Sequence, residues 1–128
     1  MATVSVRYIV DDVTTASAFY IEHLGFEVVT RPAPGFAMLT RGDLRLLLNS
    51  RDGSGGASQA MLDGRKPEPG GWNRFQIGVS DLAETVDKLR GAGVSFRNEI
   101  VEGRGGKQIL VDDPAGNPVE LFEPTEDQ

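Results

Sequence analysis

The chain contains few of the side chains that carry covalent or metal chemistry. Its 128 residues include no cysteine and a single histidine, His23. The absence of cysteine excludes disulfides, thiolate catalysis and thiolate-bound metals, and one histidine excludes a His-rich metal site within one chain. A Ser-His-Asp triad would need His23 as its base, but His23 lies in a predicted helix, where we expect it to be exposed to solvent.

Composition places the chain among single globular domains. Hydrophobic residues make up 39% of it and charged residues 25%, which permits a core and argues against disorder. The net charge of −6 argues against a nucleic-acid binder, which would present a basic face to phosphates. No apolar run approaches the roughly 20 residues that cross a bilayer, and the N-terminus lacks the pattern of a signal peptide. We therefore expect a cytoplasmic protein that binds neither nucleic acid nor membrane.

Two segments repeat the same order of strand, aspartate and helix. Residues 4–10 are rich in β-branched residues, and both this segment and residues 74–79 are predicted to be strands. Asp12 and Asp81 follow them, where a carboxylate can cap the free N–H groups of the next helix. Apolar residues at helical spacing come next, and Gly25 is predicted to end the first helix. The chain therefore reads as an internal duplication.

Each predicted helix is followed by three short extended segments. They span residues 26–30, 36–40 and 44–50 in the first half and residues 94–98, 107–111 and 119–123 in the second. Residues 112–117 join the last two and have the composition of a tight turn. We therefore predict an α+β fold of two tandem βαβββ modules, residues 1–50 and 72–128, within one structural domain.

Two glycine-rich segments lie between the predicted elements. Residues 51–71 contain six glycines and two prolines, which indicates either a mobile linker or a lid over a ligand, two functions that are compatible. Residues 103–107, Gly-Arg-Gly-Gly-Lys, are similar to a loop that cradles an anion. They lack a Walker pattern and a following helix, so a hairpin turn is favoured there.

Three features together resemble the vicinal oxygen chelate superfamily, which includes glyoxalase I, extradiol dioxygenases, fosfomycin-resistance enzymes and bleomycin-resistance proteins. These are the two βαβββ modules, the helix end Phe19-Tyr20…Leu24-Gly25-Phe26 and the closing stretch from Asp113 to Phe122, Asp-Pro-Ala-Gly-Asn-Pro-Val-Glu-Leu-Phe. The resemblance covers nearly the whole chain apart from residues 51–71. It implies a curved mixed sheet with a concave cavity, helices on its outer face, and a homodimer.

The resemblance also implies where a metal would be bound. Enzymes of that superfamily hold a divalent cation on the concave sheet with ligands from the first and last strand of each half. Carried over, these positions fall at Ser5, Leu47 (within one or two residues), Arg74 and Glu120. Leu47 has no lone pair to offer, Ser5 is a weak neutral donor, and the guanidinium of Arg74 cannot coordinate a cation. If Arg74 and Glu120 share a pocket, they pair, and the guanidinium of Arg74 takes the place of the metal. We therefore expect no metal and no cofactor.

Strand alternation then assigns the candidate ligand-binding side chains to the concave face. They combine apolar surface with a few directional polar groups, as small-molecule pockets do: Ser5, Arg7, Ile9, Arg45, Leu47, Asn49, Arg74, Gln76, Glu120 and Phe122. Two aromatic residues next to glycines, Phe36 and Trp72, are further candidate ligand contacts.

Several candidates have a second interpretation that the sequence leaves open. The three arginines of that set are either ligand contacts or solvated or paired strand residues. Gln76 either contacts ligand or serves a core hydrogen bond. Trp72 either stacks on a planar ligand or plugs the core beneath residues 51–71. Phe36 is either a pocket wall or a hairpin anchor.

The leading hypothesis is a metal-independent small-molecule-binding protein of the bleomycin-resistance type. It would sequester an aromatic or planar, partly cationic, natural-product-like ligand between Trp72, Phe36, Phe122 and the Arg and Glu groups. One alternative is a metalloenzyme of the glyoxalase or dioxygenase class with the metal held by other residues. Another is a metal-free isomerase or lyase with Glu120 as base, although Arg74 would oppose this by stabilising the charged carboxylate. A third is a dimerising accessory protein with a collapsed cavity.

Overall fold

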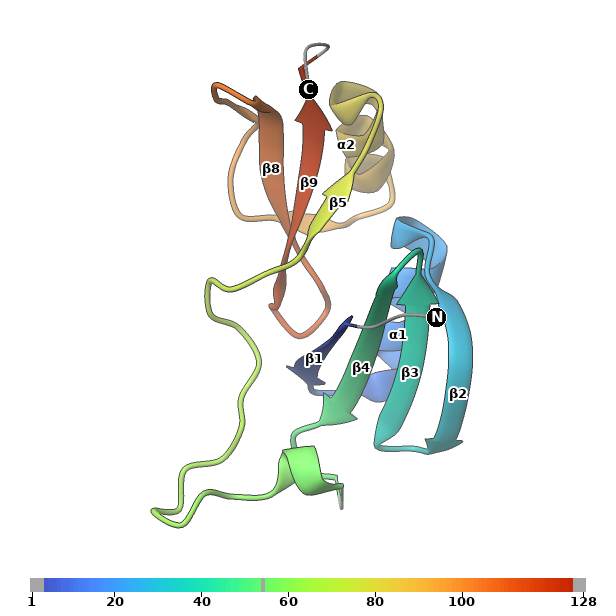
Figure 1. The fold of residues 1–128 in the computed structure, drawn as a ribbon, viewed down its shortest axis with the longest axis vertical. Helices are drawn as coiled ribbons and strands as arrows, with labels where there is room; N and C mark the ends of the chain where they lie inside the picture. The colour runs from blue at the N-terminus through green and yellow to red at the C-terminus, as the bar shows by residue number, and fades with distance from the viewer. Residues whose placement is uncertain (1–3, 54, 126–128) are drawn as a thin grey trace. The chain divides into compact units, whose positions relative to one another are not determined.

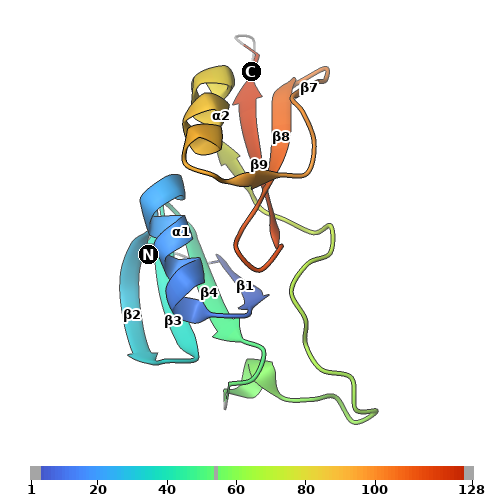
Figure 2. The same cartoon turned by 180° about the vertical axis from the view of Figure 1, so that it is seen from behind.

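The structure, a computed structural model, describes residues 4–53 and 55–125. The chain divides into two compact units, Met1–Gly70 and Gly71–Gln128. Each unit contains one sheet and one helix that covers a face of that sheet (Figures 1 and 2).

The first unit has the predicted βαβββ order. Its elements are β1 (Val4–Val10), α1 (Val13–Leu24), β2 (Glu27–Ala33), β3 (Phe36–Arg41) and β4 (Leu44–Ser50). In the sheet the strands lie in the order β1-β4-β3-β2. β1 is parallel to β4, and the other pairs are antiparallel. The first strand of the module therefore lies at one edge of the sheet, beside the last strand.

Local capping signals set the two ends of α1. The Asp12 side chain accepts a hydrogen bond from the Thr15 N–H at 3.1 Å, which satisfies one of the free donors of the first turn. Gly25 ends the helix with φ 74°, and its N–H donates to the Tyr20 carbonyl. A left-handed residue at this position favours glycine. Both predictions are confirmed.

The core of the first unit lies between α1 and its sheet. Tyr8, Val10, Leu39, Leu46 and Leu48 are buried. They meet the aromatic side of the helix, where the Phe19 and Tyr20 rings pack edge to face at 5.1 Å and Tyr20 packs on Phe26 in the same way. The opposite face of the sheet is left for the polar positions described below.

The second unit repeats this topology, although three of its strands are only two or three residues long. Its elements are β5 (Gln76–Gly78), α2 (Leu82–Gly91), β6 (Ser95–Phe96), β7 (Val101–Glu102), β8 (Gly106–Asp112) and β9 (Pro118–Pro124). The order is β5-β9-β8-β6, β7 also pairs with β8, and β5 is parallel to β9. The α+β class with two tandem βαβββ modules is confirmed, with β7 as an additional two-residue strand that the sequence did not predict.

The predicted strand over residues 74–79 is too long. Only Gln76–Gly78 form the ladder with β9. Single bonds extend the contact at both ends: the Glu120 N–H donates to the Phe75 carbonyl at 3.0 Å, and the Val79 N–H donates to the Phe122 carbonyl at 2.8 Å. Arg74 therefore lies just before β5, and the bond at Phe75 fixes the position of its backbone relative to β9.

Two carboxylates cap α2. Asp81 accepts from the Glu84 N–H at 3.0 Å, as predicted. Glu123, on β9, accepts from the Leu82 N–H at 2.8 Å. The second bond ties the first turn of the helix to the sheet, over a core that includes Ile77, Val86 and Leu121.

The closing turn forms as predicted. The buried carboxylate of Asp113 accepts from the N–H groups of Ala115 and Asn117 at 2.8 and 2.9 Å. The Asp113 N–H donates to the Asn117 carbonyl at 2.9 Å, which closes the loop between β8 and β9. Gly103 and Gly106 are joined by a backbone bond of 2.8 Å between β7 and β8, so the glycine-rich segment 103–107 is the predicted hairpin turn.

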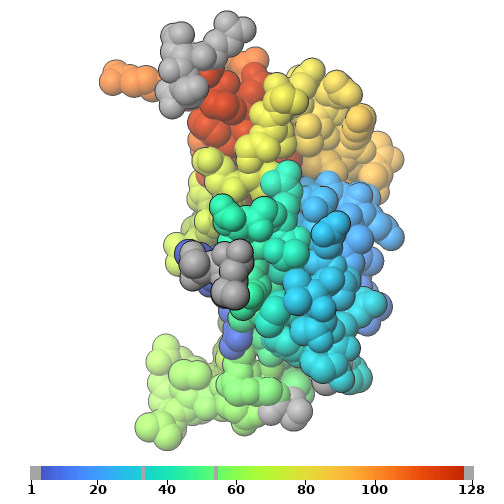
Figure 3. All heavy atoms as spheres, turned by 45° about the vertical axis from the view of Figure 1, so that its right-hand side comes forward, coloured from blue at the N-terminus to red at the C-terminus, as the bar shows by residue number. Residues whose placement is uncertain are grey.

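The described part of the linker has short-range order. One turn of 3-10 helix, Gly56–Ser58, was not predicted, and the Ser58 hydroxyl donates to the Ser50 carbonyl. The Met61 N–H donates to the Arg65 carbonyl at 2.7 Å, so the chain reverses around a fully exposed Leu62. Figure 3 shows this part of the chain (light green) projecting from the first unit. Among the described residues, no helix is both long enough and apolar enough to cross a membrane.

Candidate functional site

A hydrogen-bonded ion pair lies on the face of the second sheet that points away from α2. Oε1 of Glu120 accepts from Nε and Nη2 of Arg74 at 3.0 and 2.8 Å. Oε2 accepts from Nε2 of Gln76 at 2.6 Å. The Glu120 side chain is 11% exposed and that of Arg74 is 28% exposed. The predicted pairing of Arg74 with Glu120 is confirmed.

Strand register brings these three side chains together. Gln76 lies directly opposite Glu120 in the parallel ladder of β5 and β9, so both point to one face of the sheet. Arg74 precedes Gln76 by two residues and reaches the same carboxylate. On its other side Glu120 lies opposite Leu110 of β8, which is buried. The carboxylate therefore has an apolar neighbour on one side and hydrogen-bond donors on the other.

The residues at this site do not fit a divalent metal. Both oxygens of Glu120 already accept hydrogen bonds from a guanidinium and an amide NH₂ group, and neither of these donating groups can bind a cation. In the part of the chain that the structure describes, no three His, Asp or Glu side chains are grouped closely enough to hold a metal.

Trp72 is not a core residue. It is 69% exposed, so the interpretation in which it plugs the core beneath the linker is wrong. Its carbonyl accepts from Nη1 of Arg74 at 3.2 Å. The guanidinium carbon of Arg97 lies 4.8 Å from the centroid of its ring. The indole is therefore largely exposed to solvent and lies against Arg97, while the backbone carbonyl of Trp72 contacts Arg74 of the ion pair.

Arg97 is a site residue that sequence reasoning missed. Its Nε donates to Oδ1 of Asp112 at 2.6 Å, its Nη1 to the Gly71 carbonyl at 2.7 Å and its Nη2 to the Gly116 carbonyl at 2.8 Å. The sequence offered only an arginine in a predicted extended segment. The antiparallel pairing of β6 with β8, with Ser95 opposite Asp112, is what brings Arg97 to these partners.

Phe122 adds a second aromatic ring to this face of the sheet. It follows Glu120 by two residues on β9 and is half-buried. Its ring lies against Gly105 and Gly106, with Cζ 3.8 and 3.0 Å from where their Cβ atoms would be. On the β5 side it is paired with Gly78, where a Cβ would meet no atom within 4 Å. The sheet is therefore open beside the ring on that side.

The candidates of the first unit share one face of their sheet, as alternation predicts. Ser5 lies opposite Arg45 and Arg7 opposite Leu47 in the β1–β4 ladder. Asn49 lies opposite Phe36 in the β3–β4 ladder. Ser5 and Arg7 are exposed, while Phe36, Arg45 and Leu47 are half-buried. Their function as ligand contacts stays a prediction.

Two polar residues of this unit, Asn49 and His23, are less exposed than polar surface residues usually are. Asn49 is 4% exposed, and its Oδ1 has no hydrogen-bond partner among the described residues. His23 is half-buried rather than exposed, because its ring packs on that of Phe19 with 5.7 Å between centroids. The expectation of a fully solvated His23 is therefore wrong.

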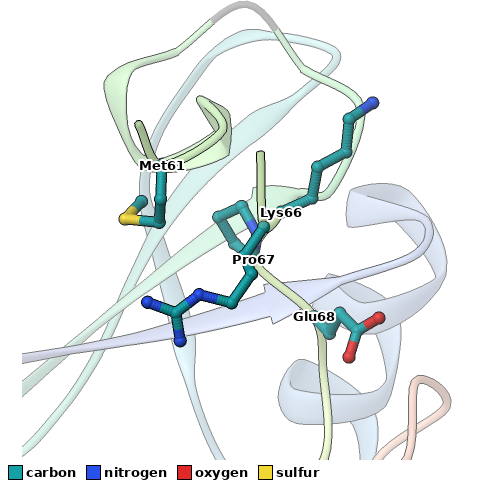
Figure 4. A pocket seen from close by; sticks show the side chains of 5 residues that line it. Met61, Lys66, Pro67 and Glu68 are labelled. Atoms are coloured by element: carbon teal, nitrogen blue, oxygen red, sulfur yellow. The ribbon is translucent and has the colours of Figure 1, made fainter. Parts of the chain in front are cut away.

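The linker borders an open hollow of about 570 Å³, and none of the predicted site residues lines it. It is lined by Met61, Arg65, Lys66, Pro67 and Glu68 (Figure 4). The charged ends of Lys66 and Glu68 point in different directions in this view. They do not converge on one point as the polar groups of a ligand pocket do, and the site on the second sheet is the better candidate.

Several solved structures are similar to this chain over nearly its whole length. A solved member of the glyoxalase/bleomycin resistance protein/dioxygenase superfamily from Sphaerobacter thermophilus is 27% identical, with a TM-score of 0.73, and the match covers 96% of this chain and 98% of that one. Lactoylglutathione lyase from Agrobacterium tumefaciens is 24% identical, with a TM-score of 0.71 and coverage of 95% and 92%. TnmS3, an antibiotic binding protein from Streptomyces sp. CB03234, is 21% identical, with a TM-score of 0.71 and coverage of 94% and 93%.

The likenesses to lactoylglutathione lyase and to TnmS3 are likenesses of fold alone. No curated protein sequence matches the chain. The family model for Glyoxalase/Bleomycin resistance protein/Dioxygenase matches residues 3–121. This confirms the resemblance drawn from the repeated modules and the closing motif. The chain belongs to the Glyoxalase/Bleomycin resistance protein/Dioxygenase superfamily.

Proposed function

We propose that this protein binds and sequesters an aromatic or planar small molecule without a metal, in the manner of the bleomycin-resistance members of its superfamily. The observation that carries the proposal is the pairing of Arg74 and Gln76 with both oxygens of Glu120. In that arrangement the carboxylate orients a guanidinium and an amide, and its oxygens are taken up by protein donors.

The surroundings of the pair supply what a planar ligand needs. Trp72 and Phe122 offer two aromatic rings, one exposed and one half-buried. Within the described part of the chain, Arg74 uses three of its five N–H groups, so others remain for a ligand acceptor. Aromatic surface with a few oriented polar groups is the usual composition of a small-molecule site.

Catalysis by Glu120 as a base is less well supported. A general base needs an oxygen within hydrogen-bond reach of the substrate proton, and both oxygens of Glu120 already accept strong, charge-assisted or short hydrogen bonds. Family membership supports a homodimer as the working assembly, which light scattering of the purified protein measures directly.

The single tryptophan makes the test direct, because intrinsic tryptophan fluorescence reports Trp72 alone. The purified protein is titrated with a panel of planar aromatic natural-product antibiotics and, separately, with Fe²⁺, Mn²⁺, Ni²⁺ and Zn²⁺. We expect saturable quenching by at least one organic compound, unchanged by a chelator.

Variants then locate the binding. Arg74→Met and Glu120→Gln should weaken the organic ligand at least about tenfold, the size of effect for one lost charge-assisted hydrogen bond. Arg65→Met, which removes an exposed arginine of the linker, should leave the affinity unchanged. Saturable binding of a divalent metal together with no response to any organic compound would overturn the proposal.

A further inference from the structure

We propose that Arg97 sets the charge class of the ligand: the ring that stacks on Trp72 is electron-rich and neutral, or anionic, and not cationic. This inference rests on the proposed function and specifies the ligand of the same site. It departs from the expectation of a partly cationic ligand.

One face of the indole already carries a cation. The guanidinium carbon of Arg97 lies 4.8 Å from the ring centroid, within the range in which a cation is attracted to the negative face of an aromatic ring. Trp72 is nevertheless 69% exposed, so the remaining surface of the indole is available. A ligand ring that stacks on Trp72 therefore meets an indole whose π electrons are drawn towards Arg97.

The guanidinium cannot easily move away from an incoming charge. All three of its nitrogens donate hydrogen bonds, to Asp112, Gly71 and Gly116, at 2.6 to 2.8 Å. Its side chain is only 17% exposed. A cation that stacked on the free side of the indole would be repelled by a charge that is fixed in place, whereas an anionic or electron-rich ring would be attracted.

The backbone of Trp72 is held as firmly as its ring. Its carbonyl accepts from Arg74, and the Gly71 carbonyl accepts from Arg97. Gly70 and Gly71 have φ values of 106° and 88°, which side chains with a Cβ rarely adopt. Two guanidinium groups therefore flank Trp72, one at its ring and one at its backbone carbonyl, and each is paired with a carboxylate, Asp112 or Glu120. The guanidinium of Arg97 lies over the ring itself and is the charge that a stacked ligand meets through the indole.

The second unit contains a matched control for Arg97. The guanidinium of Arg90 lies 5.1 Å from the centroid of Phe96. Its side chain is 45% exposed and is paired with Glu99. Arg90→Met removes a cation over an aromatic ring without touching Trp72, Arg74 or Glu120.

The test uses three probes that share one ring system: 2-naphthoate, 2-naphthalenemethanol and 2-naphthylmethylammonium, titrated by calorimetry. We expect the wild-type protein to bind the anion and the alcohol about two- to fivefold more tightly than the ammonium compound, the size of a cation–ring effect at an exposed site. Arg97→Met should abolish that preference, and Arg90→Met should keep it. Near-ultraviolet circular dichroism of Trp72 should change in Arg97→Met without ligand, because the indole loses its stacked partner.

A second variant protects the test against misfolding. Arg97→Met leaves Asp112 without its cation, whereas Arg97→Met/Asp112→Asn removes both charges and should show the same loss of preference. The inference is overturned if the ammonium compound binds most tightly to the wild type, or if both Arg97 variants bind the probes with unchanged preference. It is also overturned if no naphthalene probe binds while another organic ligand does, a result that leaves the proposed function standing.

Discussion

Two ion pairs of the chain have the same length and very different surroundings. Nη2 of Arg74 lies 2.8 Å from Oε1 of Glu120, and Nε of Arg65 lies 2.8 Å from Oδ2 of Asp63. The first pair has side chains that are 28% and 11% exposed, and the second has side chains that are 80% and 55% exposed. Replacing each arginine by methionine therefore compares a partly buried pair with a solvated one.

The structure predicts unequal costs. Arg74→Met leaves a carboxylate that is 11% exposed with one remaining donor, Gln76. Stranding a fully buried charge costs about 3–5 kcal/mol. Since water can enter the space that Arg74 leaves, we expect a loss of about 2–3 kcal/mol. Arg65→Met should cost no more than about 0.5 kcal/mol.

Removing the other partner should cost less. Glu120→Gln leaves Arg74, whose side chain can turn to water from its 28% exposed position, so about 1 kcal/mol is expected. The double variant Arg74→Met/Glu120→Gln should lose less than the sum of the single variants, because the partners are in direct contact.

Urea unfolding followed by far-ultraviolet circular dichroism measures all four variants, with the fluorescence of Trp72 as a second probe. The reasoning is refuted if Arg74→Met costs no more than Arg65→Met, or if Glu120→Gln costs more than Arg74→Met. Additive losses in the double variant would also show that the two side chains do not stabilise each other.

Three further outcomes are expected. Asp81→Ala should lower the stability to thermal unfolding by about 1 kcal/mol because α2 loses a capping bond; the exposed Asp87→Ala is the control, and an equal loss there would contradict the capping role. Gly106→Ala should cost at least about 2 kcal/mol because its Cβ would lie 2.1 Å from the Glu123 carbonyl oxygen, whereas Gly105→Ala, with no atom nearer than 3.8 Å, should leave the melting temperature within a few degrees of the wild type. Dialysis against a chelator should leave the melting temperature unchanged, and elemental analysis that found one firmly bound metal per chain would oppose this.

The sequence predicted most accurately what depends on neighbouring residues. Asp12 and Asp81 cap their helices, and Gly25 ends α1, because each acts on backbone groups within a few residues of itself. The duplication predicted the βαβββ order of elements along the chain in both modules. The strand predicted over residues 74–79 was too long, because the number of residues that pair in β5 depends on a partner, β9, that is distant in sequence.

In the candidate site, too, features set by local sequence were predicted and features set by distant partners were not. Alternation placed Gln76 and Glu120 on one face, and the resemblance predicted the Arg74–Glu120 pair. Arg97 could not be found this way, since its function depends on three partners that only the folded chain assembles. Trp72 could not be assigned to core or surface either, because an isolated aromatic residue after two glycines fits both.

The reversal of the chain around Leu62 has a practical consequence. Leu62 is fully exposed, and Arg65 is 80% exposed at its side chain, in a stretch with neither helix nor strand. Exposed tips of this kind are preferred points of attack for proteases and accept inserted peptides. Cleavage by trypsin after Arg65 would leave every strand and both long helices uncut, and an epitope tag inserted at the tip would leave both sheets complete.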